Sequence, residues 1–239
     1  GDGETGAALV ESPLVNKVSF TGSIHTGKRI MQACAARSIK PVTPELGGKS
    51  TLIILSDADV DSAVAGAMMA NFFSQVLVHR SSVESFTAKL VECTKNMKVD
   101  DPLDESTRVG SAICKDHVDK VKAYIDGAKT AGARILCGGE RITVPGLEGG
   151  FYISPCVMTD VKEDMVVYKD EIFGSVLLIL PFDDEEDALR MVNYSDTGLA
   201  AGIFTKSVSK AQKLAARLHV GNVYVNTYND GCESTEFGC

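Results

Sequence analysis

The sequence lacks several features that would tie it to common classes of protein. Acidic residues outnumber basic ones, 32 against 24, and no stretch gathers Lys and Arg into a stripe. Nucleic-acid binding relies on clustered basic side chains, so no nucleic-acid partner is expected. No apolar run approaches the ~20 residues of a membrane span, and the first residues resemble neither a signal nor a transit peptide. We therefore expect a cytoplasmic protein with no membrane partner.

Spacing typical of metal ligands is missing as well. The seven cysteines are scattered, odd in number and never in Cys-x-x-Cys spacing, and the four histidines lie far apart. A disulfide framework or a zinc site needs paired or regular spacing. The sequence therefore predicts no metal site, and cysteines that are reduced and mostly buried.

A phosphate-binding loop is also excluded, although the stretch TPELGGKSTLIIL (43–55) has part of the pattern. Such a loop needs a glycine five places before its Gly-Lys-Ser and must open a helix. Thr43 stands where that glycine should be, and the residues after Ser50 read as a short buried strand. Glu45, just ahead of paired glycines, needs another explanation.

What is present is an alternation of strand-like and helix-like segments in a chain long enough to bury a core. Strands are expected at 18–20, 51–55, 134–137, 176–180, 201–204 and 223–225, and helices at 28–36, 57–75, 84–95, 117–131, 185–192 and 209–218. Ser56 or Asp57 would cap the second helix. The pattern predicts an α/β fold with a mostly parallel sheet flanked by helices.

One turn is a candidate anion site. Phe20-Thr21-Gly22-Ser23 reads as a strand end and a tight turn at a helix start, where the helix dipole favours negative charge. An ordinary capped helix would give the same pattern, so both readings stay open here.

Several separated stretches resemble one family, in order and over essentially the whole chain. They include VNKVSFTGSIHTGKRIM (15–31), KPVTPELGGKSTLIILSDADVDSAV (40–64), KDEIFGSVLLILPFDDEEDAL (169–189) and GNVYVNTYND (221–230). These resemble the carboxyl-terminal half of an NAD(P)-dependent aldehyde dehydrogenase of the betaine and aminoaldehyde branch. The resemblance implies an aldehyde substrate and NAD or NADP as cofactor.

The resemblance also implies roles for individual residues. Glu45 corresponds to the general base that activates water, and Glu171 to the carboxylate that holds the nicotinamide ribose. The remaining matches are Gly22, Ser23 and Gly27 at the pyrophosphate, Phe173 and Leu46 beside the nicotinamide, and Phe237 near the substrate tunnel.

The departures from the family bear on activity. In the family, a helix like the one ending at Gln75 continues into a Gly-Gln-x-Cys loop whose cysteine attacks the aldehyde, but here Val76 follows at once. Without a thiolate the covalent route is closed. Cys137 and Cys156 lie in strand-like settings without a cationic neighbour, so neither is expected to substitute. Pro44, beside the base, should disturb how Glu45 is aimed.

We therefore expect residues 1–47 to be a remnant of the NAD-binding domain and residues 48–239 to be a catalytic domain without its nucleophile loop. The adenosine pocket would lie upstream, so NAD binding should be weak, and exposed apolar surface should cause self-association. The predicted function is an aldehyde dehydrogenase-type oxidoreductase with impaired or absent activity. The alternative is a non-catalytic pseudoenzyme, or a truncated product that acts as a binding protein.

Overall fold

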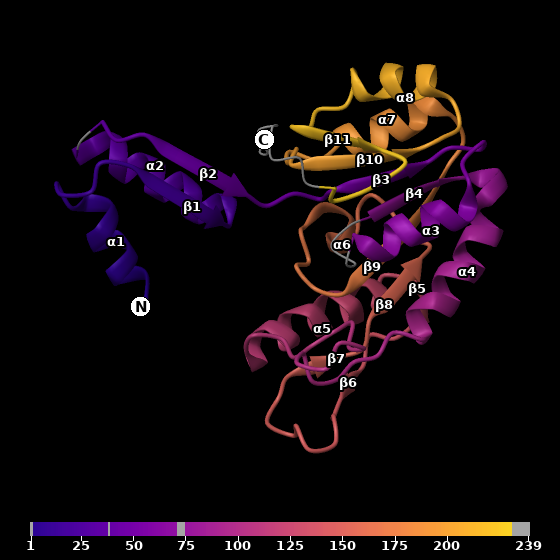
Figure 1. Ribbon diagram of the computed structural model, residues 1–239, viewed down its shortest axis with the longest axis horizontal. Coiled ribbons are helices and arrows are strands. Elements are labelled where there is room, and N and C mark those ends of the chain that lie inside the picture. The colour runs from indigo at the N-terminus through magenta and orange to yellow at the C-terminus, as the bar shows by residue number, and fades with distance from the viewer. Residues whose placement is uncertain (1, 38, 71–74, 231–239) are drawn as a thin grey trace.

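A seven-stranded sheet forms the centre of the larger structural unit in the computed structural model, which describes residues 2–37, 39–70 and 75–230 (Figure 1). The strand order is β11-β10-β3-β4-β9-β8-β5, and all neighbours are parallel except β8 and β5. The strands are β3 (Thr51–Ile54), β4 (Gln75–His79), β5 (Arg134–Cys137), β8 (Cys156–Thr159), β9 (Val176–Phe182), β10 (Ala200–Phe204) and β11 (Asn222–Val225). The predicted α/β fold with a mostly parallel sheet is confirmed.

Helices cover both faces of this sheet, which is why its strands read as continuous apolar runs. Leu52 and Ile54 of β3 pack into one core cluster with α3 and α4, whereas Ile53 between them joins the other cluster with α5, α7 and α8. The helices are α3 (Val60–Met69), α4 (Val83–Lys95), α5 (Lys115–Thr130), α6 (Val166–Lys169), α7 (Glu185–Asn193) and α8 (Val208–Ala215). A 3-10 turn η1 (Arg80–Ser82) and the short pair β6 (Arg141–Ile142) and β7 (Tyr152–Ile153) complete this unit.

The expected helix over 57–75 was wrong at both ends. Helix α3 begins after Asp59, whose carboxylate accepts a hydrogen bond from the Ser62 N–H at 2.8 Å, so Asp59 is the cap. Asp57 instead accepts from the Thr205 hydroxyl at 2.8 Å. Gln75 opens strand β4, and its side-chain amide donates to the Thr51 hydroxyl at 2.9 Å. Pairing with the neighbouring strand therefore decides the structure of Gln75, while residues 71–74 lie outside the described parts of the chain.

A smaller unit precedes the large sheet and stands apart from it in Figure 1. It holds α1 (Gly3–Glu11), β1 (Val18–Gly22), α2 (Ile24–Arg37) and β2 (Val42–Leu46), with β1 and β2 paired in parallel. Helix α2 begins at Ile24 rather than Lys28, because Ser23 caps it. Residues 47–50 connect the two units.

Strand β2 was not among the predicted strands, and Pro44, which was expected to disturb the aim of Glu45, lies in its middle. The structure pairs Pro44 with Phe20 in a sheet of only two strands. A proline is tolerated on such an edge strand, where its missing N–H need not serve a second neighbour. Pro44 therefore leaves the strand that carries Glu45 intact.

No helix in the described parts of the chain is long and apolar enough to span a bilayer. The expectation of mostly buried thiols holds for Cys34 and Cys156 but fails for Cys93 and Cys114, which are exposed.

Candidate functional site

Two groups of predicted residues lie on different units, and the segment that joins the units contacts one of them, Glu171. Gly22, Ser23, Gly27, Glu45 and Leu46 belong to the small unit, at the ends of β1 and β2 and the start of α2. Glu171 and Phe173 belong to the loop between α6 and β9 on the large unit. Phe237 lies outside the described residues.

Ser23 serves as the N-cap of helix α2. Its hydroxyl oxygen accepts from the Thr26 N–H at 3.2 Å, and the hydroxyl lies 3.0 Å from that of Thr26. The capped-helix reading is therefore correct as local structure. The dipole of α2 still points its positive end at this turn, so a phosphate contact remains a prediction.

Gly22 and Gly27 have packing reasons to be glycine. A Cβ on Gly27 would lie 2.6 Å from Cδ2 of Leu46, so the missing side chain lets α2 sit against the end of β2. A Cβ on Gly22 would lie 2.6 Å from the ring of Phe20. Leu46 is thus tied to α2, and this contact fixes the residue next to Glu45.

Glu45 is half-buried at the penultimate position of β2, opposite Thr21. Its Oε2 atom is buried and has no hydrogen-bond partner among the described residues. A buried carboxylate oxygen without a partner carries an unmet desolvation cost. Such an atom is able to accept a proton from a water molecule or a substrate that reaches it.

Glu171 lies against the segment that joins the two units. A Cβ on Gly47 would sit 2.1 Å from the Glu171 Oε2 atom, so only glycine leaves room for the carboxylate. Burial raises the pKa of Glu171, while a hydrogen bond from the Gly48 N–H and the charges of Lys120 and Lys49 partly offset that rise. The arrangement leaves a carboxylate that can accept hydrogen bonds from hydroxyl groups, as the ribose role requires.

Phe173 follows two residues later with its side chain 59% exposed. Its backbone has a φ of 56°, in the left-handed region that non-glycine residues seldom occupy. The ring meets His117 edge to face, with centroids 6.2 Å apart. A strained backbone that presents an aromatic ring to solvent suits a ring used for stacking.

Lys49 contacts the loop that carries Glu171, and from the sequence it was considered only as part of the excluded phosphate-loop pattern. Its side chain is 8% exposed, and its ammonium group donates to the carbonyl oxygens of Val167 and Asp170. Burial lowers the pKa of Lys49 to about 8. The paired glycines just before it were the only signal that this lysine sits in a constrained place.

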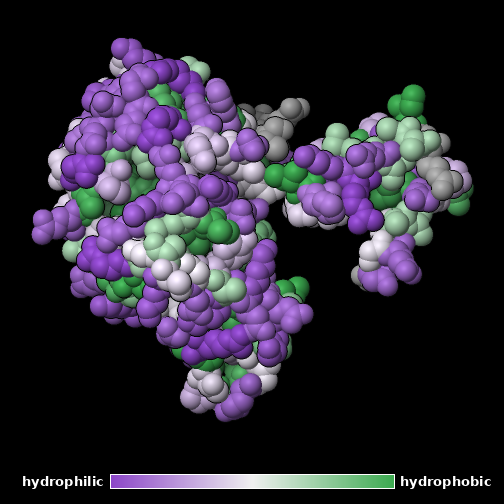
Figure 2. Space-filling view, turned by 180° about the vertical axis from the view of Figure 1, so that it is seen from behind, coloured by the Kyte–Doolittle hydropathy of each residue, from purple (hydrophilic) through white to green (hydrophobic). Residues whose placement is uncertain are grey.

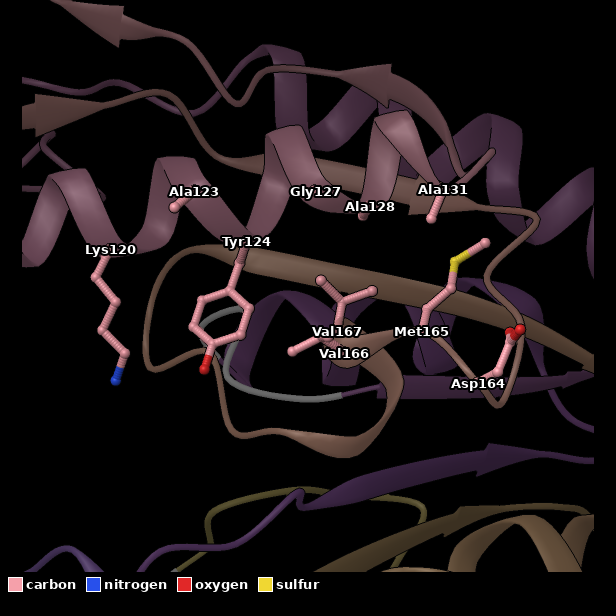
Figure 3. Close-up of a pocket in the computed structure, with 10 residues that line it drawn as sticks. All are labelled: Lys120, Ala123, Tyr124, Gly127, Ala128, Ala131, Asp164, Met165, Val166 and Val167. Carbon is pink, nitrogen blue, oxygen red and sulfur yellow. The ribbon is translucent and has the colours of Figure 1, made fainter.

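A mainly apolar cavity of about 520 Å³ lies beside the Glu171 loop, between α5 and α6. Figure 3 shows the small residues of α5 facing Met165, Val166 and Val167, with Lys120 and Asp164 at opposite ends. The Tyr124 hydroxyl donates to Asp170 at 3.0 Å and thereby closes one wall. None of the sequence-predicted residues lines this cavity, but Lys120 links it to Glu171 through its charge.

Two thiols of the large unit, Cys137 and Cys156, are poorly suited to nucleophilic attack. Burial raises the pKa of Cys156 to about 12, and burial also raises the pKa of Cys137. A thiolate is the reactive form of cysteine, so both thiols are held in the unreactive form at neutral pH. The expectation that neither has a cationic neighbour was wrong, since the charge of Lys95 acts on Cys137 and that of Lys122 on Cys156, but burial outweighs both lysines.

Comparison with known proteins identifies the fold and the motifs together. The sequence model described as "Aldehyde dehydrogenase family" matches residues 1–238. The chain belongs to the aldehyde dehydrogenase family. A 4-trimethylaminobutyraldehyde dehydrogenase A of Danio rerio is 45% identical and covers 100% of this chain and 49% of that protein. A betaine aldehyde dehydrogenase of Brucella anthropi is 42% identical, over 96% of this chain and 49% of the relative. This aldehyde dehydrogenase chain thus spans about half the length of the curated relatives it matches.

Solved structures of aldehyde dehydrogenases have the same fold as this chain. An aldehyde dehydrogenase of Bacillus cereus in complex with NAD+ superposes with a TM-score of 0.93 at 40% identity, over 100% of this chain and 50% of that one. A betaine aldehyde dehydrogenase of Staphylococcus aureus, also in complex with NAD+, has a TM-score of 0.93 at 34% identity, over 99% of this chain and 50% of that one. The Danio rerio alignment runs over 249 positions, more than the 239 residues here, so it includes positions at which this chain has no residue.

Proposed function

We propose that this chain is an aldehyde dehydrogenase-type oxidoreductase scaffold that keeps its cofactor and water-activating carboxylates but lacks the cysteine nucleophile. One observation carries the proposal. Helix α3 ends at Met69 and strand β4 begins at Gln75, and the residues between them, Ala-Asn-Phe-Phe-Ser, include no cysteine. The family resemblance puts the nucleophile in this connection. The thiohemiacetal from which hydride would leave therefore has no sulfur on which to form.

Two buried or partly buried thiols support the same conclusion. Cys137 on β5 and Cys156 on β8 have raised pKa values because they are buried. A cysteine nucleophile needs a lowered pKa or a base that takes its proton, and the raised pKa values of both thiols oppose this. Aldehyde oxidation through either thiol is therefore not expected.

The residues present fit a bound NAD or NADP at its nicotinamide end. The Glu171 carboxylate would accept from the ribose hydroxyls, and the exposed ring of Phe173 would lie beside the nicotinamide. Gly22, Ser23 and Gly27 would lie at the pyrophosphate, and Leu46 at the nicotinamide. The cofactor, when bound, supplies the hydride acceptor. The apolar side chains of Phe173 and Leu46 would exclude water from the hydride transfer.

Glu45 would act on water in such a site. Its unpartnered Oε2 atom could take a proton from a water molecule and so make that water a better nucleophile. Without the cysteine, no acyl thioester forms for this water to attack. The substrate class follows from the relatives, whose names specify trimethylamino and betaine aldehydes. We propose a small aldehyde with a quaternary ammonium group as the ancestral substrate.

The test is an assay of NADH formation with trimethylaminobutyraldehyde, together with hydrolysis of an activated ester. An intact relative is the positive control, and single Cys→Ser variants of this chain are the matched set. We expect no rate above the uncatalysed background in either assay. A rate comparable with that of the relative, abolished by one of the Cys→Ser changes, would overturn the proposal.

Cofactor binding is tested separately by calorimetric titration with NAD. We expect weak or undetectable binding, because the predicted contacts reach only the pyrophosphate and the nicotinamide end and must offset the lost freedom of the ligand. Glu148→Gln, in an exposed loop, is the control for Glu171→Gln. A micromolar dissociation constant that is raised by Glu171→Gln and unchanged by the control would show a working site.

A binding role is the second candidate function. It is favoured by large apolar side chains that the small unit exposes, with Ile39 100% and Leu14 88% accessible. Exposed apolar surface of this kind promotes association between chains or with a partner. Self-association is the form that we propose first.

A further inference from the structure

We infer that Lys49 is a positioning residue, which fixes the Glu171 carboxylate against the Gly48 N–H by pinning residues 47–50 to the end of α6. The inference rests on the proposed function only in that Glu171 is taken as the cofactor carboxylate. Lys49 itself belongs to a motif that the phosphate-loop reading left unexplained.

The first step is the geometry of the Lys49 ammonium group. It donates to the Val167 carbonyl inside α6 and to the Asp170 carbonyl at the end of that helix, the latter at 2.6 Å. The carbonyl groups in the last turn of a helix have no intrahelical partner, and a cation is favoured there. Asp170 directly precedes Glu171, so the same contact sets where the Glu171 backbone begins.

The second step is how tightly the connecting segment is held. The Lys49 N–H donates to the Thr197 hydroxyl at 3.3 Å, and a Cβ on Gly48 would lie 2.5 Å from the Cβ of Leu199. On the other side, Gly47 makes room for the Glu171 carboxylate. The segment therefore packs between the loop before β10 and the loop after α6, and the hydrogen bonds of the Lys49 side chain hold it there.

The third step is electrostatic. Lys49 is buried, and its charge faces those of Asp170 and Glu171, which partly restore the lowered pKa of the lysine. The Lys49 charge in turn opposes the rise in the Glu171 pKa that burial causes. Loss of Lys49 should therefore release the Gly48 hydrogen bond and raise the Glu171 pKa further.

Lys40 is a matched comparison within the same chain. It is also 8% exposed and donates to two backbone carbonyls, those of Val10 and Ser12, each at 2.6 Å. Its contacts join the end of α1 to the segment that leads into β2 and do not involve Glu171. If removing any buried lysine simply loosened the protein, replacement of Lys40 and replacement of Lys49 would have the same effect on Gly48 and Glu171.

The experiment measures the amide exchange of Gly48 and the carboxyl titration of Glu171 by NMR, in the wild type, Lys49→Met and Lys40→Met. We expect Lys49→Met to speed Gly48 exchange by about tenfold, the cost of one charge-assisted hydrogen bond, and to raise the Glu171 pKa. Lys40→Met should leave both readouts unchanged. Unchanged readouts in Lys49→Met, or equal changes in Lys40→Met, would overturn the inference.

A double variant separates positioning from general loosening. If Lys49 acts through Glu171, then Glu171→Gln speeds Gly48 exchange in the wild type but adds nothing in Lys49→Met. Equal effects of Glu171→Gln in both backgrounds would contradict the inference. If Lys49→Met does not fold, Lys49→Gln takes its place with the same expected results. The NMR measurements are made without added NAD. A failure of the proposed cofactor binding would therefore appear in the calorimetric titration and would not change the Gly48 exchange or the Glu171 titration.

Discussion

The small and the large unit are both built mainly from parallel strands and helices, but they bury very different shares of their side chains. All four residues of β3 in the large unit are buried, and its sheet is covered on both faces. In the small unit, β1 and β2 have no buried residue, and Val10 is the one buried residue of α1. Figure 2 shows the small unit as a separate lobe with hydrophobic patches on its surface. Nearly all hydrophobic stabilisation thus belongs to the large unit.

This difference divides the candidate site. Glu45 and the predicted pyrophosphate residues are held by a two-stranded sheet, which is marginal by itself. Glu171 is held by the well-packed unit, and Lys49 fixes the connection between them. Precise placement of Glu171 is therefore a property of the large unit, whereas placement of Glu45 depends on the weaker one.

The largest effect should come from the core of the large sheet. Leu77, on the central strand β4, is fully buried, and Leu77→Ala should lower the free energy of unfolding by about 2–5 kcal/mol. Leu14→Ala in the small unit should change it by less than about 0.5 kcal/mol, since Leu14 is exposed. Urea unfolding followed by circular dichroism measures both. Equal losses would show that the two units share one core.

The next effect concerns pH and the connection. Burial lowers the pKa of Lys49 to about 8 from its usual 10.5, so between these pH values the unfolded chain binds more protons than the folded one. This lysine therefore makes stability rise as pH increases from 8 to 10.5. The difference in unfolding free energy between wild type and Lys49→Met should grow by up to about 3 kcal/mol over that range. A difference that stays flat with pH would mean that Lys49 is solvated.

A smaller effect on stability, with a large effect on association, is expected at the exposed residues of the small unit. Leu14→Lys and Ile39→Lys together should leave the unfolding free energy within about 0.5 kcal/mol. The pair should shift the chain toward monomer, because each replaces exposed apolar surface with charge. Light scattering after size exclusion reports the mass. If the oligomers were unchanged, the surface through which the chains associate would lie in another part of the molecule.

The smallest effect should come from a surface ion pair of the large unit. Arg80 meets Asp183 at 2.5 Å, and both side chains are more than half exposed. The Arg80 hydrogen bond holds the pKa of Asp183 below its usual range, so any stabilisation is present at neutral pH and disappears on acidification. Asp183→Asn should therefore be nearly silent in unfolding experiments at pH 7. A clear loss there would show that the pair is less solvated than its exposure indicates.

The fold could be predicted from the sequence because apolar runs and helical spacing repeat along the large unit. The prediction failed where contacts between distant residues determine the local structure. Gln75 extends a helical pattern by composition, but its amide bonds to Thr51 in the sheet. Strand β2 was not predicted, and its Pro44 is tolerated because the strand pairs with only one neighbour. The role of Lys49 depends on carbonyl groups more than a hundred residues away, and no local pattern encodes them.

The central claim is that the chain keeps the carboxylates of the family without a reactive thiol. Alkylation by iodoacetamide at pH 7, followed cysteine by cysteine with mass spectrometry, tests it most directly. Cys93 and Cys114 should react at the rate of ordinary exposed thiols, and Cys137 and Cys156 much more slowly, because burial raises their pKa values. A cysteine anywhere in the chain that reacts far faster than a free thiol, and that NAD or an aldehyde protects, would contradict the account.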